Sequence, residues 1–203
     1  METYIQLNRS FRLLPKDHEF NEGEFEIAQS LGFGGEADKQ GWDQLLDLYR
    51  VIILAEAGAG KTEEIQQITT KLRSENEYAF FFRLESLSGS LRTSFEIGNE
   101  QEFDVWLSSN KDAWFFLDSV DEARLKSFRN FEEAIRSFAA ELSDNKQRAH
   151  IYITSRPSEW RPKADLSLIK GQLPLVEVTP AEVSDEDGPT LNQHAAQNSV
   201  KGV

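Results

Sequence analysis

The chain has 203 residues, the size of one large domain or of one domain with tails. Apolar residues make up 39% of it and charged residues 28%, enough for one globular core, and the absence of cysteine excludes disulfides, thiolate zinc sites and a cysteine nucleophile. With 22 basic and 35 acidic residues the formal charge is −13, which argues against nucleic acid as a partner.

The apolar runs are short. The longest, at residues 51–55 and 113–117, fall far below the ~18 residues that a membrane-spanning helix needs. Residues 1–10 alternate apolar and polar side chains and lack the apolar segment of a signal peptide. We therefore expect a cytoplasmic protein that does not contact a membrane.

Residues 1–41 form an N-terminal extension whose structure the pattern does not define. Apolar residues at three- and four-residue spacing then predict a short amphipathic helix over 42–49. Beyond it, short apolar runs alternate with helical patterns. The runs predict strands at 51–55, 78–84, 113–117, 151–154 and 173–178, and the helical spacing predicts helices after residue 62, around 103–107 and over 131–142.

Strands that alternate with helices predict an α/β fold with a mostly parallel, five-stranded sheet between helices. We assign this domain to residues 42–180. Residues 181–203 have an acidic cluster, few large apolar side chains and no periodicity, so we expect a disordered tail or linker. A terminal helix over 191–200 is the alternative.

Residues 55–62, AEAGAGKT, fit the phosphate-binding loop GxxxxGK[ST], with alanine in place of the first glycine. Gly58 and Gly60 let the backbone wrap an anion, while Lys61 adds a mobile positive charge and Thr62 offers a hydroxyl to Mg²⁺. A predicted strand precedes the loop and a predicted helix follows it, which favours this interpretation over a glycine-rich turn with an exposed lysine. The predicted nucleotide-binding residues are Ala55, Ala57, Gly58, Ala59, Gly60, Lys61, Thr62 and Glu63.

A second motif, WFFLDSVDE at 114–122, brings Asp118 to the carboxyl end of a buried strand. There its carboxylate can share a Mg²⁺ with Thr62. Asp121 and Glu122 follow closely enough to return to the same site and to orient or deprotonate an attacking water. Alternatively, these two carboxylates only oppose the dipole of a following helix.

The third motif, IYITSRP at 151–157, ends a strand in small hydroxyl residues and an arginine. Arg156 is predicted to reach the γ-phosphate and to respond to its presence, as a catalytic or sensing residue. An arginine at a strand end is by itself usually a surface residue, so the order of the three motifs carries this prediction.

In that order, AEAGAGKT, FFLDSVDEA and YITSRP resemble the motifs of NACHT-type STAND NTPases, members of the AAA-like (ASCE) class of P-loop proteins. The resemblance covers roughly residues 42–178. It implies a sheet in which the strand before Arg156 lies between the strands that lead to Lys61 and to Asp118. It also implies a domain that binds ATP or another nucleoside triphosphate with Mg²⁺ and controls self-association, in bacteria often in antiphage defence.

Two functions stay open. One is a slow ATP phosphohydrolase that acts as an oligomerisation switch, and the other is a scaffold that holds nucleotide with little or no turnover. STAND proteins continue into a helical lid, a winged-helix unit and a sensor array, and nothing after residue 178 resembles these. We therefore expect a fragment, or a domain whose lid comes from a larger partner, with adenine contacts from residues 41–49. A AAA+ remodelling motor is disfavoured because no trans-acting arginine finger is evident.

Overall fold

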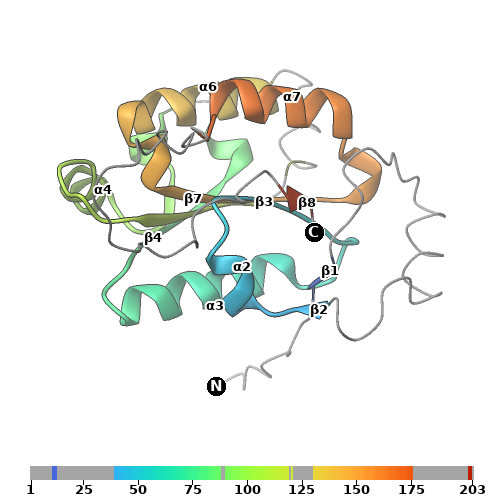
Figure 1. Ribbon diagram of the computed structural model, residues 1–203, viewed down its shortest axis with the longest axis horizontal. Helices are drawn as coiled ribbons and strands as arrows, with labels where there is room; N and C mark the ends of the chain where they lie inside the picture. The colour runs from blue at the N-terminus through green and yellow to red at the C-terminus, as the bar shows by residue number, and fades with distance from the viewer. Residues whose placement is uncertain are drawn as a thin grey trace, which may run out of the picture.

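The computed structural model describes residues 11–12, 39–87, 90–118, 120, 130–175 and 201–202. These residues form an α/β fold, in which a mostly parallel sheet lies between two layers of helices (Figure 1). The edge strand β5 is antiparallel to β4, and the other strand pairs described in this sheet are parallel. In spatial order the strands are β5 (Phe95–Ile97), β4 (Tyr78–Arg83), β6 (Ala113–Asp118), β7 (Ala149–Ser155), β3 (Arg50–Leu54) and β8 (Lys201–Gly202).

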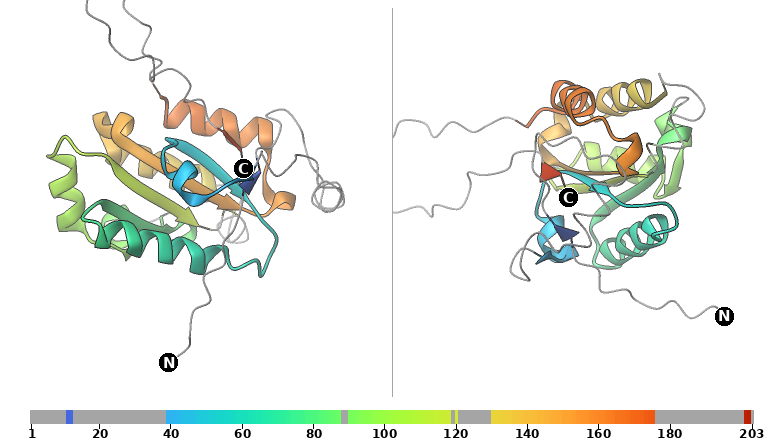
Figure 2. Two further views of the ribbon diagram at one scale, coloured as in Figure 1. Left: turned by 60° about the horizontal axis from the view of Figure 1, so that its bottom comes forward. Right: turned by 90° about the vertical axis from the view of Figure 1, so that its right-hand side faces the viewer.

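Helices cover both faces of this sheet, as the end-on view of Figure 2 shows. α6 and α7 lie on one face, and α2 and α3 lie on the other (Figure 1). A separate pair of two-residue strands, β1 (Phe11–Arg12) and β2 (Lys39–Gln40), lies next to α2. The helices are α2 (Trp42–Leu46), α3 (Lys61–Ser74), α4 (Glu100–Leu107), α6 (Asn130–Leu142) and α7 (Pro162–Gln172), with 3₁₀ turns η2 (Leu84–Ser86), η3 (Leu91–Thr93), η4 (Ser143–Arg148) and η5 (Pro157–Glu159).

Alternation along the central strands divides the core into two clusters, because successive strand side chains point to opposite faces. In β6, Phe115 and Leu117 pack in the cluster that contains α6, and Phe116 packs in the cluster that contains α3. These strands are buried on both sides, which explains why they read as continuous apolar runs. Each fully buried phenylalanine contributes about 1.5–3 kcal/mol of transfer free energy.

The predicted strands at 51–55, 78–84, 113–117 and 151–154 are confirmed as β3, β4, β6 and β7, and every end lies within two residues of its predicted position. β7 lies between β3 and β6, the order that the family resemblance implies. The helix predicted over 131–142 is α6, which buries its whole predicted apolar face. That face consists of Phe131, Ala134, Ile135, Phe138, Ala139 and Leu142.

Other predictions were wrong in part. The helix predicted over 42–49 ends at Leu46, and Tyr49 instead stacks on His150 as the chain enters β3. The strand predicted at 173–178 does not begin at Leu173, which caps the C-terminal end of α7 and is buried in the core. Residues 176–178 lie outside the described residues. β8 occupies the edge beside β3, within the tail predicted to be disordered. β5 and α7 were not predicted.

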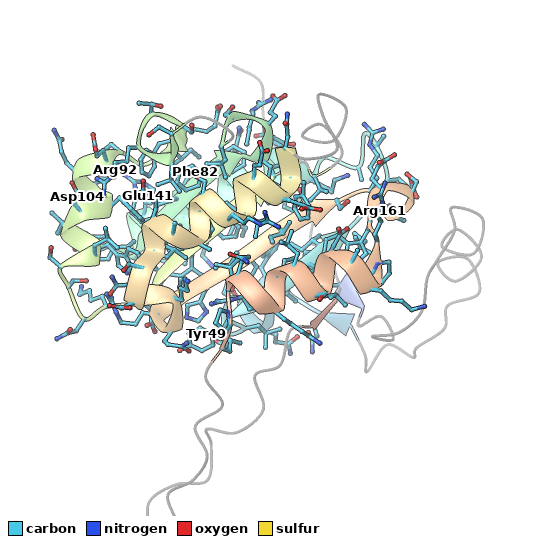
Figure 3. The ribbon with its side chains drawn as sticks, turned by 90° about the horizontal axis from the view of Figure 1, so that it is seen from above. Tyr49, Phe82, Arg92, Asp104, Glu141 and Arg161 are labelled. Atoms are coloured by element: carbon cyan, nitrogen blue, oxygen red, sulfur yellow. The ribbon has the colours of Figure 1, made fainter. Side chains whose placement is uncertain are left out.

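On the α6 side, ion pairs connect surface elements. Arg92 in η3 lies 2.7 Å from an Asp104 oxygen in α4 and 3.2 Å from a Glu141 oxygen in α6, and the three gather in Figure 3. Partly exposed pairs of this kind contribute about 0–1 kcal/mol each. They connect helices rather than form a site. Among the described helices, none combines the length and the apolar character needed to cross a membrane.

Candidate functional site

The loop that follows β3 has the backbone conformation expected of an anion-binding loop. Gly58 and Gly60 have φ angles of 71° and 75°, a left-handed region that other residues adopt only with strain. A Cβ at Gly58 would meet no atom within 4 Å, so backbone conformation rather than space requires glycine there. The loop starts beside β7, because the Ala55 N–H donates to the Ser155 carbonyl at 3.2 Å.

The loop leads directly into α3, a helix of 14 residues whose N-cap is Gly60. The Glu64 N–H donates to the Gly60 carbonyl at 3.1 Å and closes the first helical turn. N–H groups in the first turn of a helix lack acceptors within it and point out of its N-terminal end, here toward the loop. Within the loop, Ala57, Gly58 and Gly60 are exposed, and Ala55 and Ala59 are half-buried.

Lys61, the first residue of α3, folds back over the loop. Its Nζ lies 2.5 Å from the Ala55 carbonyl oxygen and 2.9 Å from that of Glu56. An ammonium group is a compact charge with three donors on a flexible stem, so it can exchange carbonyl partners for the oxygens of an anion. The ammonium group of Lys61 therefore lies over the loop that is predicted to bind an anion.

Thr62, Asp118 and Thr154 meet at the carboxyl end of the central strands. The Thr62 hydroxyl donates to Asp118 Oδ2 at 2.5 Å, and the Thr154 hydroxyl of β7 donates to Asp118 Oδ1. Asp118 is 1% exposed and Thr154 is fully buried. The two residues predicted to hold Mg²⁺ are thus in contact, although they are 56 residues apart in the sequence.

The pair of oxygens suits a magnesium ion. Mg²⁺ binds oxygen ligands at about 2.0–2.1 Å in octahedral geometry, so neighbouring ligands lie about 2.9 Å apart. A small widening would let Thr62 Oγ1 and Asp118 Oδ2 share one ion, and Asp118 can also reach it through a water. No cluster of three or more histidine, aspartate or glutamate side chains with the geometry for a metal occurs in the described residues. Mg²⁺ needs none, since one or two protein oxygens with phosphates and waters suffice.

The remaining predicted residues divide into three groups. The Glu63 side chain is exposed and accepts a bond from Gln67 Nε2 at 3.0 Å, so this carboxylate points along the helix surface and not into the loop. Arg156 is half-buried and follows Ser155, the residue that pairs with Leu54 at the start of the loop. Asp121 and Glu122 lie outside the described residues.

Two contacts of the site were not predicted. Thr154 was noted only as part of the third motif, although a small hydroxyl residue in a fully buried strand is a usable signal. The indole Nε1–H of Trp42 donates to Glu64 Oε1 at 2.9 Å, and the Trp42 ring also packs edge-on against Phe11. This bond connects α2 to the first turn of α3, and no local pattern indicates it.

The loop, Lys61, Thr62, Asp118 and Thr154 thus form one polar site at the carboxyl edge of the sheet, the edge at which parallel α/β sheets bind ligands. No protein family model and no curated protein sequence matches this chain.

Proposed function

We infer that this chain binds a nucleoside triphosphate, ATP in the first instance, together with Mg²⁺. The observation that carries the proposal is the contact between Thr62 and Asp118 beside a loop with two left-handed glycines. A glycine-rich turn with an exposed lysine would not require a contact between Thr62 and a buried carboxylate 56 residues away. A phosphate-binding loop does, because the cation that accompanies a triphosphate needs oxygen ligands from both elements.

In this proposal the backbone N–H groups of residues 57–60 surround the phosphates, and Lys61 approaches their oxygens from the start of α3. Bound Mg²⁺ would neutralise charge on the phosphate oxygens. Thr62 and Asp118 would hold it. A hydroxyl has one hydrogen and two lone pairs, so Thr62 can donate to Asp118 and still offer a lone pair to the ion.

The negative charge of the protein makes two cations, Lys61 and Mg²⁺, important for the binding of ATP. The chain carries a formal charge of −13, and Glu56, Glu63 and Glu64 lie in or next to the loop. A triphosphate is therefore repelled by the protein as a whole and must be attracted locally. Lys61 and Mg²⁺ supply that attraction, so we expect ATP binding to depend strongly on both.

Turnover and switching rest on the family resemblance. We assign water activation to Asp121 or Glu122, and detection of the γ-phosphate to Arg156. Support for the second role comes from the strand order, since β7 ends between the strands that lead to the loop and to Asp118. A contact made with ATP and not with ADP would shift an association equilibrium, as expected of a STAND-like switch, for example in antiphage defence.

The experiment is ATP binding by calorimetry with Mg²⁺, comparing wild type with Lys61→Ala and Lys71→Ala. Lys71 lies on the same helix and pairs at the surface with Asp43 and Glu75, so it is a matched control. Lys61→Ala should lose at least tenfold in affinity, since a charge-assisted contact is lost, while Lys71→Ala should bind as wild type does. Equal binding by all three proteins would contradict a phosphate-binding loop.

Phosphate release from the same preparations distinguishes the two functions left open. Turnover that falls in Glu122→Gln or Asp121→Asn while ATP stays bound supports the hydrolysing switch. Tight binding with no turnover in wild type supports the scaffold.

A further inference from the structure

We propose that Thr154 is a positioning residue for the cation: its hydroxyl holds Asp118 Oδ1, so that Oδ2 alone faces Thr62 and the ion. The inference rests on the proposed function, because it concerns the same magnesium site. It adds a residue that does not touch nucleotide or metal itself.

The placement follows from strand register. Leu117 of β6 pairs with Ile153 of β7, and Asp118 and Thr154 are the next residues along each strand. Neighbouring strands lie about 4.8 Å apart, which brings the two side chains within hydrogen-bonding reach. The Thr154 hydroxyl donates to Oδ1.

The chemical consequence is a fixed carboxylate. Rotation about the last torsion of an aspartate is broad, so an unrestrained carboxylate presents either oxygen or both. Here a hydroxyl from α3 binds Oδ2 and a hydroxyl from β7 binds Oδ1, which defines the plane of the group. Mg²⁺ tolerates little deviation from octahedral geometry, so a fixed single oxygen is a better ligand than a rotating pair.

The burial of Thr154 supports a specific role for its hydroxyl. All seven residues of β7 are buried, and valine would fill the same volume without a polar group. A hydroxyl placed there is matched by the equally buried carboxylate beside it. Residues that orient a metal ligand in this way typically change metal affinity by about 10–100-fold when they are replaced.

The test uses the full chain and three variants. Thr154→Val removes the hydroxyl, and Thr154→Ser retains it. Thr69→Val is the matched control, because Thr69 is also fully buried and its hydroxyl bonds only one turn back, to the Ile65 carbonyl at 2.7 Å. ATP affinity is measured in EDTA and across a Mg²⁺ titration, and Mn²⁺ binding is followed directly by electron paramagnetic resonance.

We expect Thr154→Val to keep the ATP affinity measured in EDTA and to need about 10–100-fold more Mg²⁺ or Mn²⁺ for half-saturation. Thr154→Ser and Thr69→Val should match wild type. If the role of Thr154 were merely structural, Thr154→Val would lower the affinity for ATP in EDTA and the affinity for the metal ion together, or would lower neither. If Thr154→Val does not fold, Thr154→Ala, which also removes the hydroxyl, is judged by the same criterion.

An unchanged metal requirement in Thr154→Val, or a serine variant as impaired as the valine one, overturns the inference. Wild type that binds no ATP at any Mg²⁺ concentration overturns the proposed function, and this inference with it. The two failures are distinguishable because only the second appears in wild type.

Discussion

The two ends of the central strands both hold buried polar groups, but these groups bond to different partners. At the amino end, where β3 and β7 begin, Arg50 and His150 bond to backbone carbonyls. At the carboxyl end, the hydroxyls of Thr62 and Thr154 both donate to the side-chain carboxylate of Asp118. Tyr49 and Arg161, labelled in Figure 3, lie toward these opposite ends.

Arg50 shows what the amino end does. Its guanidinium is 2% exposed and donates to the carbonyls of Tyr49 at 2.7 Å, Lys146 at 2.8 Å and Leu173 at 3.1 Å, and also to that of Ala149. Burial lowers the pKa of Arg50 to about 10, so it remains charged at neutral pH. These bonds tie η4 and the end of α7 to the start of β3.

This difference in hydrogen-bond partners indicates which end stabilises the fold and which end is able to bind a ligand. The Arg50 guanidinium is planar and is buried among the four carbonyls to which it donates, whereas the Lys61 ammonium is partly exposed on a flexible stem. Arg50 therefore stabilises the fold and is unavailable to a ligand. Hydroxyl and carboxylate groups that bond to one another retain further lone pairs and can admit a cation at little cost. Changes at the amino end should therefore alter stability, and changes at the carboxyl end should alter ligand binding.

The largest expected effect is at the amino end. Arg50→Met should lower the free energy of unfolding by about 3–5 kcal/mol, because buried carbonyls lose their charged donor. Urea unfolding followed by circular dichroism measures it. If the folded fraction of Arg50→Met binds Mg²⁺–ATP as wild type does, the two ends of the strands have separate roles. An unchanged free energy of unfolding would contradict a stabilising role for the amino end.

Asp118→Asn should have the next largest effect, at the carboxyl end. The amide keeps the shape and can still hydrogen-bond to both threonines, but it loses the charge that attracts a divalent ion. We expect about 10–100-fold more Mg²⁺ to be needed for ATP binding, the usual loss when a residue around a bound metal ion is replaced. A Mg²⁺ titration at fixed ATP tests this, and a stability loss without a change in Mg²⁺ dependence would oppose it.

Trp42→Phe should have a smaller effect. Phenylalanine keeps a ring against Phe11, whose centroid lies 4.9 Å from that of Trp42, but it loses the bond to Glu64. The expected loss is about 1 kcal/mol of stability, the usual net value of one hydrogen bond. Glu64→Gln, which retains an acceptor, should cost less. An unchanged free energy of unfolding in Trp42→Phe would show that this hydrogen bond does not contribute to stability.

The smallest effect concerns pH at the amino end. His150 stacks between Tyr49 and Trp114, with centroids 4.1 and 4.9 Å away, and its Nδ1 lies 3.1 Å from the Leu48 carbonyl oxygen. Burial lowers the pKa of His150 below its ordinary value of 6.5. The folded protein thus favours neutral histidine, so this contribution is complete above pH ~6.5 and is lost as pH falls toward the lowered value.

His150→Phe keeps an aromatic ring between Tyr49 and Trp114 and removes the titratable imidazole. Its free energy of unfolding should therefore fall less steeply than that of wild type between pH 7 and 5, an interval of about two units around the ordinary pKa. Denaturant unfolding at several pH values gives both slopes. Identical slopes would show that His150 does not contribute to the pH dependence.

Local patterns in the sequence determined much of this fold. The apolar runs of β3, β4, β6 and β7 and the helical spacing of α6 depend on neighbours two to four residues away, so they could be identified without tertiary structure. The loop with Lys61 and Thr62 is also local. α7 was missed because few apolar side chains mark it, with Ile169 the only buried apolar residue among those described in the helix.

Tertiary structure alone decided which side chains meet. The bonds from Trp42 to Glu64, Thr154 to Asp118 and Arg50 to Leu173 join residues 22, 36 and 123 positions apart. Strand order and register create these contacts, and no single segment encodes either property. The sequence by itself therefore determined the central strands, α6 and the loop with its glycines, Lys61 and Thr62, while the position of β7 between β3 and β6 decided that the Thr154 hydroxyl would bond to the Asp118 carboxylate beside it.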